Sequence, residues 1–324
     1  MTRIKRAQAL CDPKYPYAVT RYAYLGPAGT FTEAALQTIA QSSDQILPYS
    51  NVTAALDAVR SGSADRALVP IENSVEGVVA RTLDELAIGE PLVIYGEVTL
   101  PVSFSLLVLK GNEKSPISTI ATHPHAEAQC RSYIAKNYPD AEIIVTSSTA
   151  AAAQALTKNE FDAAIAAPIA ADTYGLTTLA TNIGDNDGAV TRFVLVGKPG
   201  SVPTPTGHDR TSLAAFIGAD QAGALLEVLT EFSVRGVNLT FIQSRPTGRE
   251  LGHYHFIIDA EGHINDERVG DALMGLRRIC EDVRYLGSYP RADKVAPTTT
   301  PATADASFIE ADSWLAAVRA GKKI

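Results

Sequence analysis

Short apolar runs alternate with alanine-rich segments of helical periodicity between residues 22 and 196, and this alternation constrains the fold more than any other feature. The short apolar runs are typical of buried strands, and the longer alanine-rich segments are typical of helices. Strands that alternate with helices form α/β layers, in which helices cover an open sheet. The 324 residues, 46% of them hydrophobic, supply enough apolar material for more than one core of this kind.

The composition changes at residues 198–207, KPGSVPTPTG, where three prolines and two glycines can continue neither a helix nor a strand. Beyond this boundary the apolar pattern predicts strand, helix, strand, strand, helix and strand at residues 211–217, 223–234, 237–243, 252–258, 266–280 and 283–288. That βαββαβ order is typical of a ferredoxin-like module. The Pro- and Thr-rich stretch that follows is expected to be disordered, and residues 307–320 are expected to form one or two amphipathic turns.

Charge and composition exclude several classes of protein. Lys and Arg number 28 against 36 Asp and Glu, a formal charge of -8 that disfavours a nucleic-acid partner. No apolar run reaches the roughly 18 residues of a membrane-spanning helix, and no signal-type apolar stretch follows Met1. We therefore expect no membrane partner and a cytoplasmic location. His123 and His125, like His253 and His255, lack a clear third ligand, so no metal or other cofactor is expected.

Hydroxyl and amide side chains stand where several helices are expected to begin after strands. Thr30 has Glu33 at capping-box spacing, and helices are also expected at 75–87, 124–137 and 150–157. The side chains at or before these starts are those of Thr30, Asn73, Ser74, Thr122, Ser148 and Thr149. Because strand ends share one edge of an open sheet, these groups are expected to converge on one anion-binding cleft. The alternative is that each only caps its own helix.

Four motifs, in this order, resemble the prephenate dehydratase family. They are YLGPAGTFTEA at 24–34, PIENS at 70–74, THP at 122–124 with Gln129 downstream, and TRF at 191–193. In the second module, GALL at 223–226 and QSRP at 243–246 resemble the two effector-binding motifs of that family's regulatory ACT domain. The resemblance covers most of the chain except the first 20 or so residues and the tail after Arg291.

The resemblance implies a two-lobed α/β catalytic domain of the type II periplasmic-binding-protein kind, followed by a ferredoxin-like βαββαβ ACT domain. On this basis we expect an N-terminal extension at 1–20, a catalytic domain at 21–198, a linker at 199–209, the ACT domain at 210–291 and a partly disordered tail at 292–324. The first lobe is expected to comprise about 21–99 and 183–198, and the second about 100–182.

The implied reaction converts prephenate to phenylpyruvate in L-phenylalanine biosynthesis, with loss of water and carbon dioxide and without a cofactor. By resemblance Thr191 is the essential threonine, and its hydroxyl is expected to contact the leaving oxygen of the substrate. The other residues implied in catalysis are Arg192, Asn73, Gln129 and Thr122. Those expected to bind substrate are Thr30, Ser74, Ser148, Thr149 and Phe193, with Phe193 as a wall of the pocket. Arg192 and the helix N-termini are expected to hold the two substrate carboxylates.

The same resemblance implies feedback regulation by L-phenylalanine bound to the ACT domain. The expected effector-binding residues are Gly223, Ala224, Leu225, Leu226, Gln243, Ser244, Arg245 and Pro246. Gln243 stands where the motif usually has glutamate, so an altered affinity or selectivity among aromatic amino acids is expected. A homodimer or homotetramer is also expected. Two alternatives remain open: an arogenate dehydratase, and a non-catalytic small-anion binding or sensor protein on the same fold.

Overall fold

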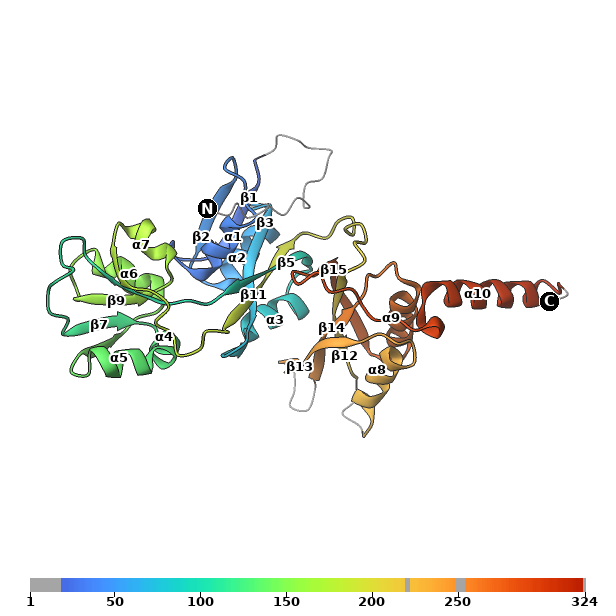
Figure 1. The fold of residues 1–324 in the computed structure, drawn as a ribbon. Helices are drawn as coiled ribbons and strands as arrows, with labels where there is room; N and C mark the ends of the chain where they lie inside the picture. The colour runs from blue at the N-terminus through green and yellow to red at the C-terminus, as the bar shows by residue number, and fades with distance from the viewer. Residues whose placement is uncertain (1–18, 219–221, 249–253, 323–324) are drawn as a thin grey trace. The chain divides into compact units, whose positions relative to one another are not determined.

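The computed structural model describes residues 19–218, 222–248 and 254–322, and the chain divides into two compact units (Figure 1). The first unit holds the residues up to Thr82 together with Val98–Val194. The second holds Leu83–Glu97 together with the residues from Leu195 onward. The chain passes between the units inside three elements, which are α3 (Ala80–Ala87), β5 (Val93–Pro101) and β11 (Val190–Gly197).

The first lobe is built on a sheet of order β2-β1-β3-β11-β5, in which the short β4 (Gly77–Val78) also pairs with β3. β1 (Arg21–Leu25) runs parallel to β2 (Gln45–Tyr49) and to β3 (Arg66–Asn73). The helices α1 (Phe31–Gln37) and α2 (Val52–Ser61) pack on these strands. Thr30 begins α1 as expected, because its hydroxyl oxygen accepts a hydrogen bond from the Glu33 N–H at 3.3 Å.

The second lobe has a sheet of order β10-β6-β9-β7-β8 covered by helices on both faces (Figure 1). Its strands are β6 (Ser105–Val108), β7 (Thr119–Thr122), β8 (Glu142–Val145), β9 (Ala163–Ala166) and β10 (Thr177–Ala180). Its helices are α4 (Pro124–Gln129), α5 (Arg131–Asn137), α6 (Thr149–Leu156) and α7 (Ile169–Tyr174). Apolar side chains of α4 and α5 pack on one face and small ones of α6 and α7 on the other. The alanine-rich helices therefore lie close to their sheet.

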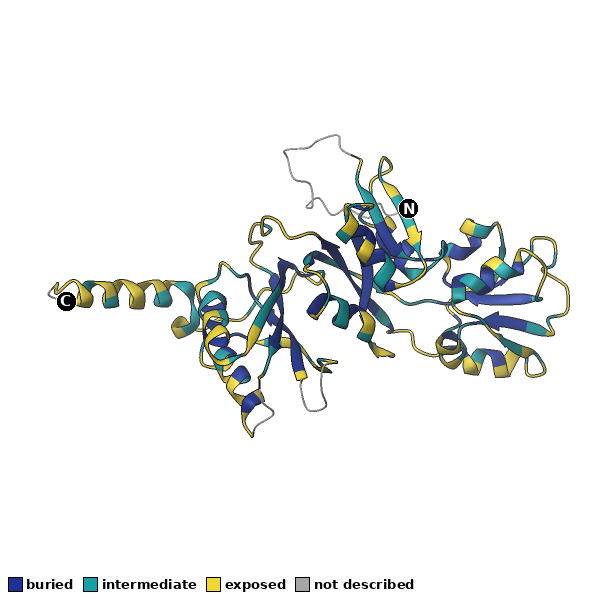
Figure 2. Cartoon of the chain, turned by 180° about the vertical axis from the view of Figure 1, so that it is seen from behind, coloured by how far each residue is buried: buried dark blue, intermediate teal, exposed yellow. Residues whose placement is uncertain are grey.

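The module after the Pro-rich boundary has the predicted βαββαβ order. Its elements are β12 (Asp209–Phe216), α8 (Ala224–Ser233), β13 (Leu239–Pro246), β14 (Tyr254–Glu261), α9 (Glu267–Ile279) and β15 (Asp282–Pro290). The antiparallel sheet has the order β13-β14-β12-β15. One face packs against both helices through a core that includes Phe232, Phe256 and Leu276. Figure 2 shows largely buried strands and helices with exposed outer faces, and the edge strand β13 is the exception because its residues are intermediate or exposed. The predicted fold class is thus confirmed.

The expected helix at 75–87 is wrong over its first half. A tight turn and the short strand β4 (Gly77–Val78) follow β3, and the helix begins only at Ala80. The reason is local, because Gly77 has a left-handed φ of 82° that interrupts a helix, and residues 77 and 78 pair with the end of β3 instead. The expected helix at 124–137 also divides, at Cys130, into α4 and α5. The strands β2 and β10 and the helix α7 were not predicted.

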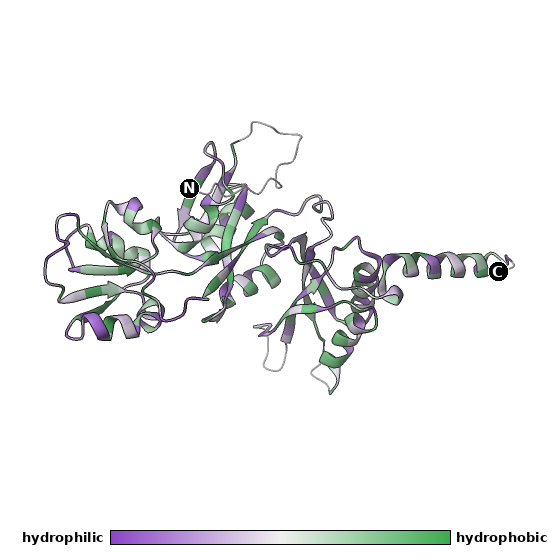
Figure 3. Cartoon of the chain, viewed as in Figure 1, coloured by the Kyte–Doolittle hydropathy of each residue, from purple (hydrophilic) through white to green (hydrophobic). Residues whose placement is uncertain are grey.

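The tail is more ordered than the sequence predicts. It contains a short 3-10 turn (Pro301–Thr303) and then α10 (Asp305–Arg319), a helix of 15 residues rather than one or two turns. α10 carries exposed apolar side chains, including that of Trp314. Figure 3 shows hydrophobic and hydrophilic residues interspersed along this helix. Most of the predicted extension at 1–20, together with His253, lies outside the described residues. Within 19–218, 222–248 and 254–322, no helix is both long and apolar enough to cross a bilayer.

Candidate active site

Asn73 stands at the end of β3 and organises the turn that follows it. Its Oδ1 accepts hydrogen bonds from the N–H groups of Val75 and Glu76, at 2.8 and 2.9 Å. Because the carbonyl end of the amide is occupied in this way, the nitrogen end must point to the other side. That nitrogen, Nδ2, donates to Thr191 Oγ1 at 2.8 Å. Two residues 118 positions apart are therefore in direct contact, both from the group that the resemblance implies in catalysis.

Ser74 holds the start of β11 beside this turn. Its N–H donates to the Val190 carbonyl and its hydroxyl oxygen accepts from the Val190 N–H, both at 2.9 Å. The sequence suggested that Ser74 caps a helix, but no helix begins at this residue. The double contact instead fixes Thr191, the next residue of β11, in its position relative to Asn73.

Arg192 is buried and its Nε lies 2.9 Å from Glu72 Oε1. Glu72 and Arg192 directly adjoin Asn73 and Thr191, so this ion pair ties the same two strands together. Arg192 was expected to bind the substrate carboxylates, whereas in the structure its guanidinium pairs with the carboxylate of Glu72. Phe193 is 1% exposed and lies in the core of the fold. It lies two positions from Thr191 on β11 and so points to the same face of the sheet, but so little of its surface is exposed that its expected place as a pocket wall stays a prediction.

Glu76 connects the first lobe to the second. Its Oε1 accepts from Gln129 Nε2 of α4 at 2.9 Å, and its Oε2 lies 3.4 Å from His125 Nδ1 on the same helix. Burial and the neighbouring His125 lower the pKa of His123, an effect that Glu76 partly offsets. The neutral His123 ring accepts the backbone N–H of His125 at Nδ1, at 3.3 Å. Gln129 thus joins the Asn73 turn through the carboxylate of Glu76. The sequence analysis did not identify Glu76 as a residue of the site.

Of the remaining predicted site residues, Thr30, Thr122 and Ser148 make hydrogen bonds to backbone groups near them in their own lobe. Thr122 is fully buried and its hydroxyl donates to the Ile165 carbonyl at 2.9 Å, so it is a structural group of the second sheet. The Thr30 hydroxyl also donates to the Leu25 carbonyl at 3.2 Å. Ser148 caps α6 by accepting the Ala151 N–H at 3.0 Å, and Thr149 is the first helical residue. Within the described chain, no hydrogen bond joins these residues to Asn73 or Thr191.

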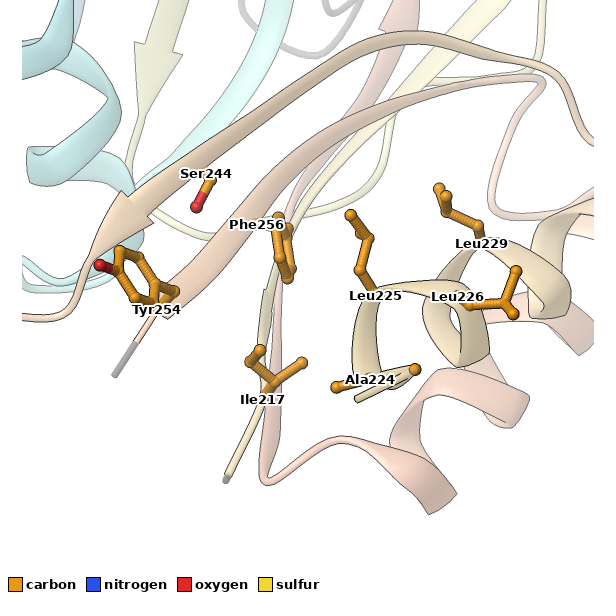
Figure 4. Close-up of a pocket in the computed structure, with 9 residues that line it drawn as sticks. Ile217, Ala224, Leu225, Leu226, Leu229, Ser244, Tyr254 and Phe256 are labelled. Atoms are coloured by element: carbon orange, nitrogen blue, oxygen red, sulfur yellow. The ribbon is translucent and has the colours of Figure 1, made fainter. Parts of the chain in front are cut away.

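A separate cavity of about 430 Å³ lies between α8 and the sheet of the βαββαβ module (Figure 4). Its lining residues are Ile217, Gly223, Ala224, Leu225, Leu226, Leu229, Ser244, Tyr254 and Phe256. Five of these belong to the two predicted effector motifs. Figure 4 shows the strand residues Ser244, Tyr254 and Phe256 on one side and the α8 residues on the other. A mostly apolar hollow with a few polar groups is typical of a small-molecule site.

The strand β13 divides the second effector motif between two faces. Ser244 pairs with Phe256 and lines the cavity, whereas Arg245 pairs with His255 on the opposite face. There Arg245 makes a bidentate ion pair with Asp84 of α3, at 2.8 and 2.7 Å. The Gln243 amide donates to its neighbour's backbone carbonyl at 3.0 Å. Gln243 and Arg245 are therefore not among the lining residues, and the two-residue period of the strand was the signal that could have separated them from Ser244. Pro246 shares the face of Ser244 but lies at the end of β13, outside the lining.

The described residues contain no cluster of three His, Cys, Asp or Glu side chains suited to a metal ion. The side chains of the candidate site supply hydroxyl, amide, carboxylate and imidazole groups. The fold and these groups define a class of protein: a two-lobed α/β domain with a polar site formed by both lobes, followed by a ligand-binding ACT-type module.

Comparison with known proteins identifies the family within this class. The family model for prephenate dehydratase matches residues 22–201, and the ACT domain model matches residues 214–278. A prephenate dehydratase from Amycolatopsis methanolica is 49% identical over 306 residues, which cover 94% of this chain and all of that protein. The chain belongs to the prephenate dehydratase family, and the prediction of a lyase with an ACT domain is confirmed.

Two solved structures share the fold of this chain. The prephenate dehydratase of Arthrobacter aurescens, determined in complex with L-Phe, is 49% identical with a TM-score of 0.87, and the match covers 92% of this chain and 99% of that one. GqqA, described as a novel type of quorum-quenching acylase, is 29% identical with a TM-score of 0.74, and the match covers 84% of this chain and 98% of that one.

Proposed function

We propose that this chain converts prephenate to phenylpyruvate, water and carbon dioxide, and that L-phenylalanine bound to the ACT cavity inhibits the reaction. The observation that carries the catalytic proposal is the 2.8 Å hydrogen bond from Asn73 Nδ2 to Thr191 Oγ1. It orients a hydroxyl group that would otherwise rotate. Because Thr191 Oγ1 accepts from the amide, its own O–H remains a donor for the substrate.

The reaction needs this donor at one place. When the ring carboxylate leaves as carbon dioxide, the electron pair of the breaking C–C bond enters the ring, and the hydroxyl on the opposite ring carbon leaves as water after taking up one proton. Formation of the aromatic ring drives the step, so a hydrogen bond to the departing oxygen is sufficient help. A threonine hydroxyl is too weak an acid to be the proton's final source. We therefore assign Thr191 the role of hydrogen-bond donor to the leaving group.

The two substrate carboxylates require cationic or N–H donors. The Arg192 guanidinium and the capped starts of α1 and α6 remain our proposed contacts for them. Because Arg192 is engaged by Glu72, we assign it first to holding β3 and β11 in register. Thr122 and Phe193 are left out of the proposed substrate contacts, since both are fully buried.

The ACT cavity supports the regulatory part of the proposal. Its apolar lining suits an aromatic side chain, and the hydroxyls of Ser244 and Tyr254 supply polar partners. The complex of L-Phe with the Arthrobacter aurescens relative supports the same ligand here.

A contact path favours transmission of binding to catalysis. Ser244 lines the cavity, and the next residue, Arg245, holds Asp84 on α3. On the same helix, the Thr82 hydroxyl donates to the Pro70 carbonyl at 2.6 Å, three residues before Asn73 in β3. A shift of β13 on effector binding would therefore act on β3, the strand that positions Asn73. Feedback requires contacts of this kind, which differ between the effector-bound and the effector-free state.

The test measures phenylpyruvate formation from prephenate by the wild type and by Thr191→Val and Thr191→Ser. Valine keeps the shape of threonine and removes the hydroxyl, whereas serine keeps the hydroxyl. We expect the Thr191→Val variant to lose about a hundredfold or more in kcat. The Thr191→Ser variant should retain most of the wild-type kcat. Equal activity of the Val variant would refute the assigned role of Thr191.

The same assay separates the alternatives. Turnover of arogenate in preference to prephenate would identify an arogenate dehydratase, and binding of prephenate without turnover would identify a binding or sensor protein. Acylase activity, suggested by the name of GqqA, is less favoured because the described side-chain partner of the Thr191 hydroxyl is an amide rather than a base that could activate a nucleophile.

A further inference from the structure

Glu76 lies outside every motif that the sequence singled out, yet it joins the two lobes at the candidate site. Its backbone N–H is bound by Asn73 Oδ1 at 2.9 Å, so the position of the residue is fixed by the same side chain that orients Thr191. Both of its carboxylate oxygens face α4 of the second lobe. One accepts from Gln129 at 2.9 Å and the other lies 3.4 Å from His125.

We propose that Glu76 is a positioning residue that fixes the Gln129 amide relative to the Asn73–Thr191 pair. The inference rests on the proposed function, because it gives this contact a role in the dehydration. A carboxylate only accepts hydrogen bonds, so it admits Gln129 in one orientation, with the amide nitrogen toward Glu76. The Gln129 carbonyl oxygen is thereby presented as the acceptor for a donor group such as the substrate hydroxyl.

The geometry explains why such a residue is needed. Gln129 is a flexible side chain at the end of α4, whereas Asn73 and Thr191 are fixed in the sheet of the other lobe. A misplacement of about 1 Å in a reacting site can cost on the order of a hundredfold in rate. A charge-assisted hydrogen bond from Gln129 to a carboxylate anchored by Asn73 gives one continuous path from Thr191 to the second lobe.

His125 provides a second attachment for the same carboxylate. Its ring lies edge-on to that of His123, with ring centroids 4.9 Å apart, and its backbone N–H is held by His123 Nδ1. The two contacts at Glu76 therefore differ in kind, since one fixes the Gln129 amide and the other ties the carboxylate to the start of α4. Loss of His125 alone is expected to matter less than loss of Glu76.

The experiment compares Glu76→Ala, Glu76→Gln and the control Glu127→Ala in the prephenate assay. The Glu127 side chain lies on α4, pairs with Arg131, and is 31% exposed, against 32% for Glu76. We expect Glu76→Ala to lower kcat about tenfold or more with a smaller change in KM. Glu76→Gln should recover most of kcat because its amide oxygen still accepts from Gln129. The control should stay within about twofold of the wild type.

A double-mutant cycle separates positioning from a general loss of stability. In a Gln129→Ala background, Glu76→Ala should cause little further loss, because the group that it positions is already absent. Three results would each overturn the proposal: wild-type kcat in Glu76→Ala, no recovery in Glu76→Gln, or fully additive losses in the double variant.

A second readout keeps the proposal testable even if the wild type forms no phenylpyruvate, an outcome that refutes the proposed function instead. Hydrogen exchange at residues 72–78 and 124–130 reports on the two ends of the contact. Glu76→Ala should speed exchange at both, and Glu76→Gln should do so less. Unchanged exchange at both segments in Glu76→Ala would refute the contact itself.

Discussion

Replacing Asn73 by aspartate tests the hydrogen-bond direction on which the proposed mechanism depends. The substitution keeps the shape of the side chain and an oxygen for the N–H groups of Val75 and Glu76, so the turn should survive. It changes the group that faces Thr191 from a donor to an acceptor. The Thr191 hydroxyl would then donate to the new carboxylate and no longer to the substrate.

The size of the effect follows from these contacts. Loss of one oriented donor to a departing oxygen costs about 3 kcal/mol of transition-state stabilisation, or roughly a hundredfold in kcat. A new carboxylate beside Thr191, which is 8% exposed, also repels a substrate with two carboxylates, so KM should rise. The free energy of unfolding should change little, because the turn keeps its acceptor.

Asn73→Ala is the matched comparison, because it removes the acceptor and the donor together. It should lose activity and also about 1–2 kcal/mol of stability, as two backbone N–H groups lose their partner. Initial rates of phenylpyruvate formation and urea unfolding of both variants provide the measurement. Near wild-type kcat in Asn73→Asp, or a stability loss as large as that of Asn73→Ala, would refute the reasoning.

Three further predictions concern the second unit. Asp84→Asn removes the charge partner of Arg245 and should raise the phenylalanine concentration for half-inhibition about fivefold or more, while kcat without effector is kept. Ala224→Leu fills the ACT cavity and should raise the Kd for L-phenylalanine at least about tenfold in calorimetry. Glu97→Gln removes the negative charge that lies 2.6 Å from the buried Arg210 and should cost about 2–4 kcal/mol in urea unfolding.

Each of these has a result that would contradict it. Unchanged inhibition in Asp84→Asn would exclude the ion pair as the coupling contact, and Glu85→Gln on the same helix is the control. An unaltered Kd in Ala224→Leu would place the effector elsewhere. A free energy of unfolding within 0.5 kcal/mol of the wild type, about the size of an ordinary surface substitution, would show that Asp259, 3.9 Å from Arg210, compensates for Glu97.

Local signals in the sequence were reliable where the physics is local. Thr30 and Ser148 cap their helices because a side-chain oxygen and an unpaired N–H three residues later need no distant partner. The βαββαβ pattern of the second module was read correctly for the same reason, since apolar periodicity reports which face each element buries. The cap expected at Ser74 is absent because its hydroxyl oxygen accepts from the N–H of the distant Val190, and the next helix begins only at Ala80.

The sequence by itself determined the fold class, the order of the elements in the ACT module, and a set of polar residues associated with one family of lyases. Only the tertiary structure decided which of those residues meet. Asn73 and Thr191 lie 118 residues apart, and Glu76 reaches Gln129 only because two separately built sheets come together. Ser244 and Arg245 face a cavity and an ion pair respectively because strand pairing fixes which side of β13 each side chain takes. Such contacts depend on packing between distant segments, which no local pattern records.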